Sequence, residues 1–286
     1  MDKVEDFRSS DYIDEQSRWA TVGELTVHYK RQGVGHPVVL LHGSGSSLQS
    51  FDRVTELLVD SFEVVRLDLP GFGLTGPRPD RDYRITAVAD VVAQVLDVLD
   101  LRRAVVGGSS LGGNVAWNFG LDYPDRASGL VLINATGYPG KSLPLALRLA
   151  QNPLGRVLLR RLSSPRTTAR NLRSLVGSGS LGVVDDAMVR RVYAMMTRPG
   201  NQQAFIDFAN TEQLDRTGEL STVAAPTLVL RSEGVDGQHF AEQIPGSVER
   251  INPRTGHLLP EEDPEWVADQ LRQFMAEVIR IDSTKD

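Results

Sequence analysis

Residues 108–113 read Gly-Ser-Ser-Leu-Gly-Gly, and this stretch decides the fold of the 286-residue chain. It follows the apolar run 103–107 and leads into residues 114–122, in the order strand, sharp turn, helix. The pattern G-x-S-x-G fits only with Ser110 as its serine, because Ser109 would need a glycine two positions later, where leucine stands. Small residues on both sides let strand and helix close around a strained turn that exposes the serine Oγ. The stretch therefore predicts a nucleophilic serine, Ser110.

The rest of the chain alternates apolar runs with segments of helical spacing. This alternation predicts a mostly parallel, wound α/β sheet with helices on both faces. We expect an edge hairpin over 19–30, strands near 36–41, 62–69, 129–133, 226–230 and 247–251, and helices over 49–59, 85–99 and 264–280.

The alternation stops between residues 138 and 220. Leucine- and arginine-rich helical segments follow one another here, broken by four prolines and a flexible Gly-Ser-Gly-Ser at 177–180. Residues 141–200 carry 11 Lys or Arg and 2 acidic residues, although the whole chain has a net charge of −6. Such a shift in composition indicates a separate structural unit. The expected domains are an N-terminal arm (1–17), a core in two parts (18–137 and 221–286) and a helical insert (138–220).

Composition excludes several classes of function. The chain has no cysteine, which removes disulfides, thiolate catalysis and cysteine metal sites. Its net charge of −6 argues against non-specific nucleic-acid binding. No apolar run approaches the roughly 20 residues of a membrane span, and the charged first residues do not resemble a signal peptide. We therefore expect a cytoplasmic protein. The excess of Lys and Arg at residues 141–200, which we call the basic block, either steers anionic substrates toward the active-site cleft or forms a solvated outer face.

A serine hydroxyl needs a base to take its proton. Among five histidines, His257 lies in the loop 255–263, between the last strand and the last helix. In a wound sheet this is the edge where Ser110 also emerges, so His257 is the predicted base. His42 precedes a glycine in a loop and is interpreted as structural.

The base in turn needs a carboxylate partner, and two acids are placed to provide it. Asp236 and Glu233 both follow the predicted strand 226–230. The chain order serine, acid, histidine is the one expected for this type of turn. Asp236 is the first choice, and Glu233 is the alternative.

The oxyanion of a tetrahedral intermediate needs two backbone N–H donors. One is predicted at Leu111, the residue after the nucleophile and the start of a helix. The other is predicted at Ser44, in the loop after the third strand, where Gly43 lets the backbone turn inward.

The stretch 71–76, Gly-Phe-Gly-Leu-Thr-Gly, matches the dinucleotide-binding pattern G-x-G-x-x-G. It is followed by Pro-Arg-Pro at 77–79, and no helix is expected there to receive a pyrophosphate. No phosphate-binding loop and no metal-ligand spacing occur elsewhere in the sequence. We expect neither a cofactor nor a metal.

These motifs together resemble the α/β-hydrolase superfamily, in its serine esterase and C–C hydrolase branch. The matching segments span roughly residues 20–280 and read Leu-His-Gly at 41–43, Asp-Leu-Pro-Gly-Phe-Gly at 68–73, Gly-Ser-Ser-Leu-Gly-Gly at 108–113, Tyr-Pro-Asp-Arg at 123–126, Pro-Thr-Leu-Val-Leu at 226–230, Gly-His at 256–257 and Glu-Asp-Pro at 262–264. The resemblance implies the α/β-hydrolase fold, with a helical cap over the site at about 138–220.

The chain departs from the family's usual pattern at a few places. Arg231 and Ser232 stand where Trp-Gly is usual, and the following segment is several residues short. A serine nucleophile disfavours the dehalogenase and epoxide hydrolase activities, which use aspartate. Leu258 replaces the tryptophan that C–C hydrolases often carry after the histidine.

The first interpretation is thus a hydrolase of a carboxylic ester, lactone or thioester, acting on a small molecule through Ser110, His257 and Asp236. The alternatives are a C–C bond hydrolase of a diketone-like acid and a protein of this fold that binds a ligand without turnover. The sequence leaves the oligomeric state open.

Overall fold

The computed structural model describes residues 7–139, 145–161, 163–235 and 239–283. Its centre is an eight-stranded sheet with the order β1-β2-β4-β3-β5-β6-β7-β8. The strands are β1 (Arg18–Val22), β2 (Leu25–Gln32), β3 (His36–Leu41), β4 (Phe62–Leu67), β5 (Ala104–Ser109), β6 (Ala127–Ile133), β7 (Thr227–Ser232) and β8 (Val248–Asn252). All the strands expected from the sequence are present, with bounds that differ by a few residues.

The sheet is parallel except at one edge. β1 and β2 form the predicted edge hairpin, and β2 also pairs antiparallel with β4. From β4 to β8 every neighbouring pair is parallel. The carboxyl ends of these six strands therefore lie along one edge of the sheet, where open α/β sheets bind their ligands.

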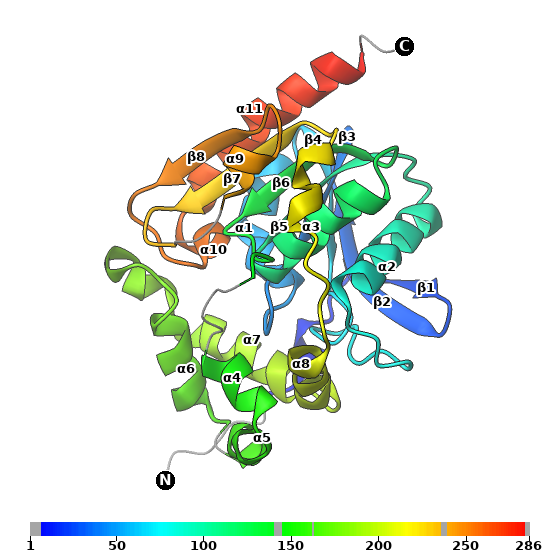
Figure 1. The fold of residues 1–286 in the computed structure, drawn as a ribbon. Helices are drawn as coiled ribbons and strands as arrows, with labels where there is room; N and C mark the ends of the chain where they lie inside the picture. Colours follow the sequence, from blue (N-terminus) through cyan, green and yellow to red (C-terminus); the bar gives the residue numbers. More distant parts are fainter. Residues whose placement is uncertain (1–6, 140–144, 162, 236–238, 284–286) are drawn as a thin grey trace.

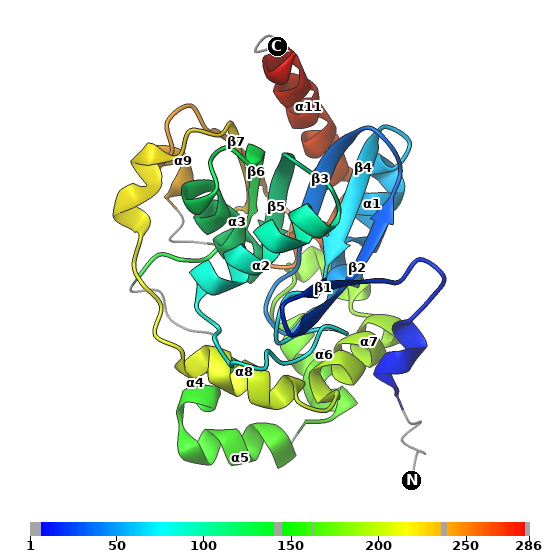
Figure 2. The same cartoon turned by 90° about the vertical axis from the view of Figure 1, so that its right-hand side faces the viewer.

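Alternating side chains of each strand supply two separate cores. On β3, Val39 and Leu41 pack on the face covered by α2 (Ile85–Val98) and α3 (Leu111–Asp122). Val38 and Leu40 point to the opposite face, against α1 (Asp52–Leu58) and α11 (Pro264–Asp282). Figure 2 shows α2 and α3 in front of the sheet and α11 behind it. The central strands are apolar on both faces because both faces are covered, as the sequence predicted.

α11 has clear start signals. The Asp263 side chain accepts a hydrogen bond from the Trp266 N–H at 3.2 Å, and Pro264 occupies the first turn. Two very short helices, α9 (Phe240–Gln243) and α10 (Leu259–Glu262), lie in the final third of the chain. Within the described ranges, none of the helices has both the length and the apolar character needed to cross a membrane.

Between β6 and β7 the chain forms a helical insertion, which we define as the described part of residues 145–210. Figures 1 and 2 both show its helices gathered at one end of the sheet. They are α4 (Leu145–Gln151), α5 (Pro153–Arg161), α6 (Pro165–Arg173), α7 (Asp186–Thr197) and α8 (Asn201–Asn210), with short 3₁₀ turns at Ser178–Val183 and, before β7, Thr217–Thr222.

The prolines of the insertion act mostly as helix starts. Pro153 and Pro165 are the first residues of α5 and α6, because a fixed φ and a missing N–H are tolerated in a first turn. Pro199 follows the end of α7. Pro144 lies outside the described residues. In the predicted flexible loop at 177–180, residues 178–180 are instead part of a 3₁₀ turn, and Gly177, just before it, makes a backbone contact described below.

The N-terminal arm lies against α7. Phe7 meets the ring of Tyr193 edge-on at 6.1 Å, and the Arg190 guanidinium lies 5.5 Å from the centre of the Phe7 ring. Asp14 forms an ion pair with Lys30 of β2. The arm thus contacts both the insertion and the sheet.

Candidate active site

Ser110 lies at the apex of the turn between β5 and α3. Its φ of 55° and ψ of −111° are a backbone conformation that a non-glycine residue adopts only when the surrounding structure enforces it. The Ser110 N–H donates to the Ile133 carbonyl at the end of β6 at 2.9 Å, and the Thr136 N–H donates to the Ser110 carbonyl at 3.2 Å. These bonds hold the strained turn in place.

The two glycines of the motif are required by close approach. A side chain at Gly108 would lie 2.3 Å from the carbonyl carbon of Gly112, and one at Gly112 would lie 2.0 Å from the oxygen of Leu41. No β-carbon fits at either position. The pattern G-x-S-x-G therefore reflects the contact between strand and helix on either side of the serine.

The structure distinguishes the two serines of the stretch. Ser109 is the last residue of β5, pairs with Ile133 of β6 and is buried. Ser110 is half-buried and follows the last strand residue, at the carboxyl edge of the sheet. The geometry thus favours Ser110 as the serine that a substrate reaches.

The loop after β3 lies directly beside Ser110. A side chain placed on Gly43 would touch Ser110 Cβ at 3.4 Å and would be 4.0 Å from its Oγ. Ser44, the predicted oxyanion donor, is exposed. Leu111 begins α3, and the first N–H groups of a helix have no partner within it. The two predicted donors therefore lie on the two segments that flank Ser110.

His42 fixes the orientation of this loop. The Leu69 N–H donates to His42 Nε2 at 3.0 Å, so the ring proton is on Nδ1, which donates to the Gly43 carbonyl at 2.7 Å. Burial lowers the pKa of His42 and keeps the ring neutral. Because C=O and N–H of one trans peptide point in opposite directions, holding the Gly43 carbonyl also directs the Ser44 N–H. His42 is structural, as its sequence context suggested.

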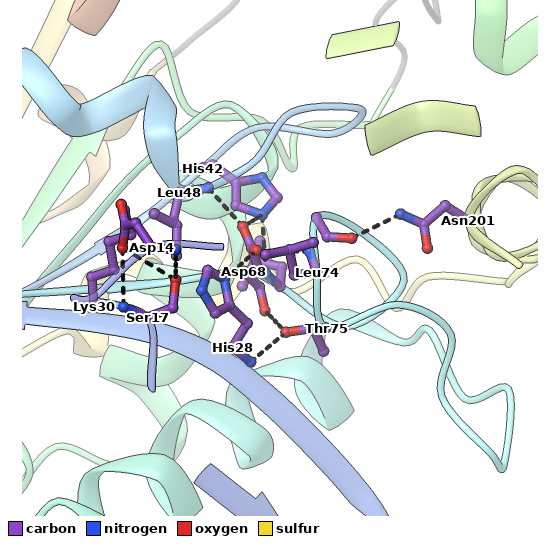
Figure 3. A network of polar contacts seen from close by, with 12 residues as sticks. Asp14, Ser17, His28, Lys30, His42, Leu48, Asp68, Leu74, Thr75 and Asn201 are labelled. Atoms are coloured by element: carbon purple, nitrogen blue, oxygen red, sulfur yellow. Dashed lines mark hydrogen bonds and ion pairs between the residues drawn. The ribbon is translucent and has the colours of Figure 1, made fainter. Parts of the chain in front are cut away.

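The segment that follows β3 also contacts a buried polar network centred on Asp68 (Figure 3). The Asp68 carboxylate accepts from the N–H groups of Leu48 and Leu74 at 2.7 and 2.8 Å, and from His28 Nδ1 at 2.7 Å. Burial alone would raise the pKa of Asp68, but the hydrogen bond from His28 and the nearby His42 ring lower it below its usual value. The network holds both the loop after β3 and the loop after β4.

The loop after β4 is the stretch that matched the dinucleotide pattern. It turns back on itself, with the Gly71 N–H donating to the Gly76 carbonyl at 2.6 Å, and the next helix begins only at Ile85. The loop therefore has no helix N-terminus to receive a phosphate.

His257, the predicted base, lies in the loop between β8 and α10 and is half-buried. The Asn134 side-chain nitrogen donates to the carbonyl oxygens of Gly256 and His257, each at 3.2 Å. Asn134 directly follows Ile133, the residue that binds the Ser110 N–H. Two consecutive residues at the end of β6 thus contact the segments that carry the predicted nucleophile and the predicted base.

Sequence reasoning missed the network around Asn134. Ser232 is fully buried, its N–H donates to Asn134 Oδ1 at 2.9 Å, and its hydroxyl donates to the Gly256 carbonyl at 2.6 Å. The Thr255 hydroxyl lies 2.8 Å from the same Ser232 oxygen. Ser232 stands where the family usually has glycine, and that departure was the available signal.

The two candidate acids have different standing. Asp236 lies outside the described residues. Glu233 is exposed in the turn after β7, and its N–H donates to the Asn252 carbonyl at 3.0 Å. The carboxylate of a catalytic triad is normally buried against the histidine, so the exposure of Glu233 fits that role poorly.

A hollow of about 540 Å³ opens at the opposite edge of the sheet. Its lining includes Arg102, Arg103, Arg126 and Pro226, which precede β5, β6 and β7. Substrates of wound sheets bind at the carboxyl ends of the strands, where Ser110 and His257 lie. This hollow is therefore separate from the candidate site.

Comparisons of sequence and of structure show which known proteins the chain is similar to. The model of the alpha/beta hydrolase family matches residues 38–270. The uncharacterized hydrolase YugF of Bacillus subtilis is 28% identical over 273 residues, which cover 89% of this chain and 96% of that protein. A 2-hydroxy-6-oxononadienedioate/2-hydroxy-6-oxononatrienedioate hydrolase of Burkholderia vietnamiensis is 32% identical over 225 residues, or 72% of this chain and 74% of that protein.

Among solved structures, a thermophilic esterase from Thermogutta terrifontis superimposes with a TM-score of 0.77 and 28% identity, covering 92% of this chain and 99% of the esterase. The N-acyl homoserine lactone degrading enzyme Est816 gives a TM-score of 0.72 at 25% identity, covering 90% of this chain and 100% of that enzyme.

Proposed function

Because the chain belongs to the α/β hydrolase family and is a hydrolase, we propose that it cleaves carboxylic esters, lactones or thioesters of small to medium organic molecules. The observation that carries the proposal is the position of Ser110, strained at the apex of its turn, with the Gly43 backbone beside it. The esterase and lactone-degrading structures similar to this chain support the same substrate class.

In the proposed reaction Ser110 Oγ attacks the carbonyl carbon while His257 takes its proton. The N–H groups of Ser44 and Leu111 bind the oxyanion that forms. His257 then gives the proton to the leaving alcohol, and water activated by His257 hydrolyses the acyl-enzyme. Asp236 accepts a hydrogen bond from the other ring nitrogen of His257 and holds its tautomer. The helical insertion serves as the cap over this site.

The test is a burst experiment with p-nitrophenyl butyrate. When deacylation is slower than acylation, an acyl-enzyme mechanism releases one equivalent of p-nitrophenol per site before steady turnover. Ser110→Ala should abolish the burst and lower kcat by about 10⁴-fold or more. His257→Ala should cause a comparable loss. Ser109→Ala is the matched control and should retain activity within about threefold, because Ser109 belongs to the strand. An inactive Ser109→Ala beside an active Ser110→Ala would refute the assignment.

Cleavage of a C–C bond in a diketone-like acid is the second candidate. It is favoured by the similarity to the dienedioate hydrolase of Burkholderia vietnamiensis. Against it, Leu258 follows the histidine, and the mostly buried Arg191 of the basic block is already in an ion pair with Glu261. We expect kcat/KM for simple esters to exceed that for such an acid by at least about tenfold. The reverse ratio would make C–C cleavage the main activity.

A further inference from the structure

Glu262 has no part in the proposed reaction, yet its carboxylate accepts hydrogen bonds from three backbone N–H groups. Oε2 accepts from the N–H groups of Gly177 and Gly256, both at 2.8 Å. Oε1 accepts from the Leu258 N–H at 3.0 Å. Two of these donors flank His257 in the sequence, and the third belongs to the helical insertion. One carboxylate therefore joins the insertion to both sides of the predicted base.

A second set of backbone contacts runs beside this carboxylate. The His257 N–H donates to the carbonyl of Leu175, in the insertion, at 2.6 Å. A side chain on Gly256 would lie 2.4 Å from that same oxygen, and one on Gly177 would lie 2.7 Å from the oxygen of Arg254. The two backbones are thus in direct contact, with no room for a β-carbon on either side.

Side chains extend the same contact. Leu258 packs against the small apolar core of the insertion, which includes Leu172 and Met188. Arg191 of α7 forms an ion pair with Glu261, and both side chains are mostly buried. The loop that carries His257 is therefore enclosed by the insertion on one side and by Asn134 on the other.

We propose that Glu262 is a positioning residue that makes the placement of His257 depend on the docking of residues 175–177. The inference rests on the proposed function for the role of His257, but the coupling of the two segments is independent of it. When residues 175–177 leave the His257 loop, the loop loses its bonds to Gly177 and Leu175 together, and the imidazole shifts relative to Ser110.

The chemistry of the side chain makes the proposal specific. A carboxylate has only acceptors and can satisfy three N–H groups from two directions. Glutamine keeps one acceptor oxygen but turns an NH₂ group toward one of the donors, so at least one bond becomes a clash. Glu262→Gln preserves size and shape, which separates the loss of these bonds from a loss of packing.

The first measurement is hydrogen–deuterium exchange, which needs no turnover. In Glu262→Gln we expect exchange to rise at least about tenfold in two peptides at once, 173–179 and 254–260, because each charge-assisted hydrogen bond contributes a tenfold factor or more. Glu265→Gln is the matched control. Glu265 is exposed on α11, and its carboxylate lies 3.5 Å from the guanidinium of Arg53. This variant should change neither peptide.

The second measurement follows the histidine itself. The carbon-bound imidazole protons of His257, assigned by their absence in His257→Ala, should shift in Glu262→Gln and stay in place in Glu265→Gln. With p-nitrophenyl butyrate, kcat per titrated site should fall by about 10²-fold in Glu262→Gln while KM changes less than about threefold, because the base is displaced by roughly an ångström and substrate binding is not.

The outcomes separate cleanly. A rise in the exchange rate of both peptides, together with a shifted His257 resonance, supports the coupling. A rise confined to peptide 254–260 overturns it, and so does a rise in both peptides with an unshifted His257 resonance. If Glu262→Gln does not fold, Gly177→Ala leaves the carboxylate intact and must give the same joint response, and a response limited to 173–179 overturns the proposal. Absence of any ester turnover in the wild type would refute the proposed function alone.

Discussion

The Asn134 side chain donates a hydrogen bond to the carbonyl oxygen of His257 at 3.2 Å. The residue before it, Ile133, accepts the Ser110 N–H at 2.9 Å. The end of β6 is thus the common support for the segments that carry the nucleophile and the base. Asn134 is fully buried and has a φ of 42°, a conformation that asparagine tolerates better than most residues.

Replacing this amide by a carboxylate is expected to make stability depend on pH. In Asn134→Asp the carboxyl group faces the carbonyl oxygens of Gly256 and His257. Repulsion favours its protonated form, so its pKa is raised in the folded state. A group with a raised folded pKa stabilises the fold at low pH and loses that contribution as pH rises through the folded pKa. At pH 8 we expect a loss of roughly 3 kcal/mol against wild type, the cost of an unpaired buried charge.

Urea unfolding of the wild type and of Asn134→Asp between pH 5 and pH 8 measures this effect. Asn134→Ala, which removes the hydrogen bonds without adding a charge, should lose stability by the same amount at every pH. A parallel, pH-independent loss in Asn134→Asp would show that the carboxylate does not face the two carbonyl groups.

The acid of the triad can be identified by comparing two amide substitutions. We expect Asp236→Asn to lower kcat by at least about 10²-fold, because the amide presents the wrong partner to the histidine. Glu233→Gln should lower kcat by less than about tenfold, since Glu233 is exposed. Steady-state kinetics on one ester are sufficient. A large loss at Glu233 alone would reassign the acid, and small losses at both would point to a carboxylate elsewhere or to a Ser-His dyad.

Two histidines whose pKa is lowered by burial, His42 in the loop after β3 and His36 in β3, predict how stability responds to acid. Burial lowers the pKa of His42, so below pH 6.5 the unfolded chain binds a proton that the folded chain does not. Stability should therefore fall with decreasing pH, by up to about 1.4 kcal/mol per pH unit for each such proton. His36, whose pKa burial also lowers, adds to the slope.

Asp68 acts in a lower range of pH. Burial opposes its ionisation, but the hydrogen bond from His28 and the His42 ring lower its pKa below 3.8 in the folded state. Its stabilising contribution is complete above pH 3.8 and is lost as pH falls through the folded pKa. His42→Gln should flatten the curve between pH 6.5 and 5, while Asp68→Asn should remove the steeper acid limb. Denaturant titrations between pH 7 and pH 2 check both predictions. An unchanged slope between pH 6.5 and 5 in His42→Gln would contradict the first, and an unchanged loss of stability below pH 3.8 in Asp68→Asn would contradict the second.

The basic block predicts a salt effect on anionic substrates. Arg166, Arg170 and Arg173 are exposed along α6 and lie on one side of that helix. If this stripe steers anions, kcat/KM for an anionic ester should fall as salt rises, while that of a neutral ester of similar size should not. Replacing all three arginines by glutamine should lower the anionic value about threefold at low salt. Equal salt dependence for both esters would make the stripe a solvated outer face.

Local patterns were enough to predict the sheet and the turn at Ser110. The apolar runs reflect burial on both faces of the sheet, and each strand shows this in its own residues. Gly108 and Gly112 flank the serine within one turn of chain, so their pattern can be recognised in the sequence, although the Leu41 oxygen that excludes a side chain at Gly112 lies in β3.

The surroundings of His257 could not be predicted in the same way. The groups that accept hydrogen bonds from the Asn134 side chain lie 98 to 123 residues away in sequence, and no periodicity records such pairs. The sequence predicts flexibility at Gly177 because glycine and serine favour loops. Its backbone contact with Gly256 depends on how the insertion meets the core, which is a tertiary property.

The contact between Gly177 and Gly256 has a consequence for how such an enzyme could change its substrate range. A different set of helices exchanged between β6 and β7 would have to bring a glycine to the same place, because the loop bearing the histidine has no space for a larger residue. The insertion is therefore not an interchangeable module. A side chain at either glycine would meet backbone atoms of the other segment, so no substitution at one position can make room for a larger residue at the other, and both should stay glycine across descendants of this sequence.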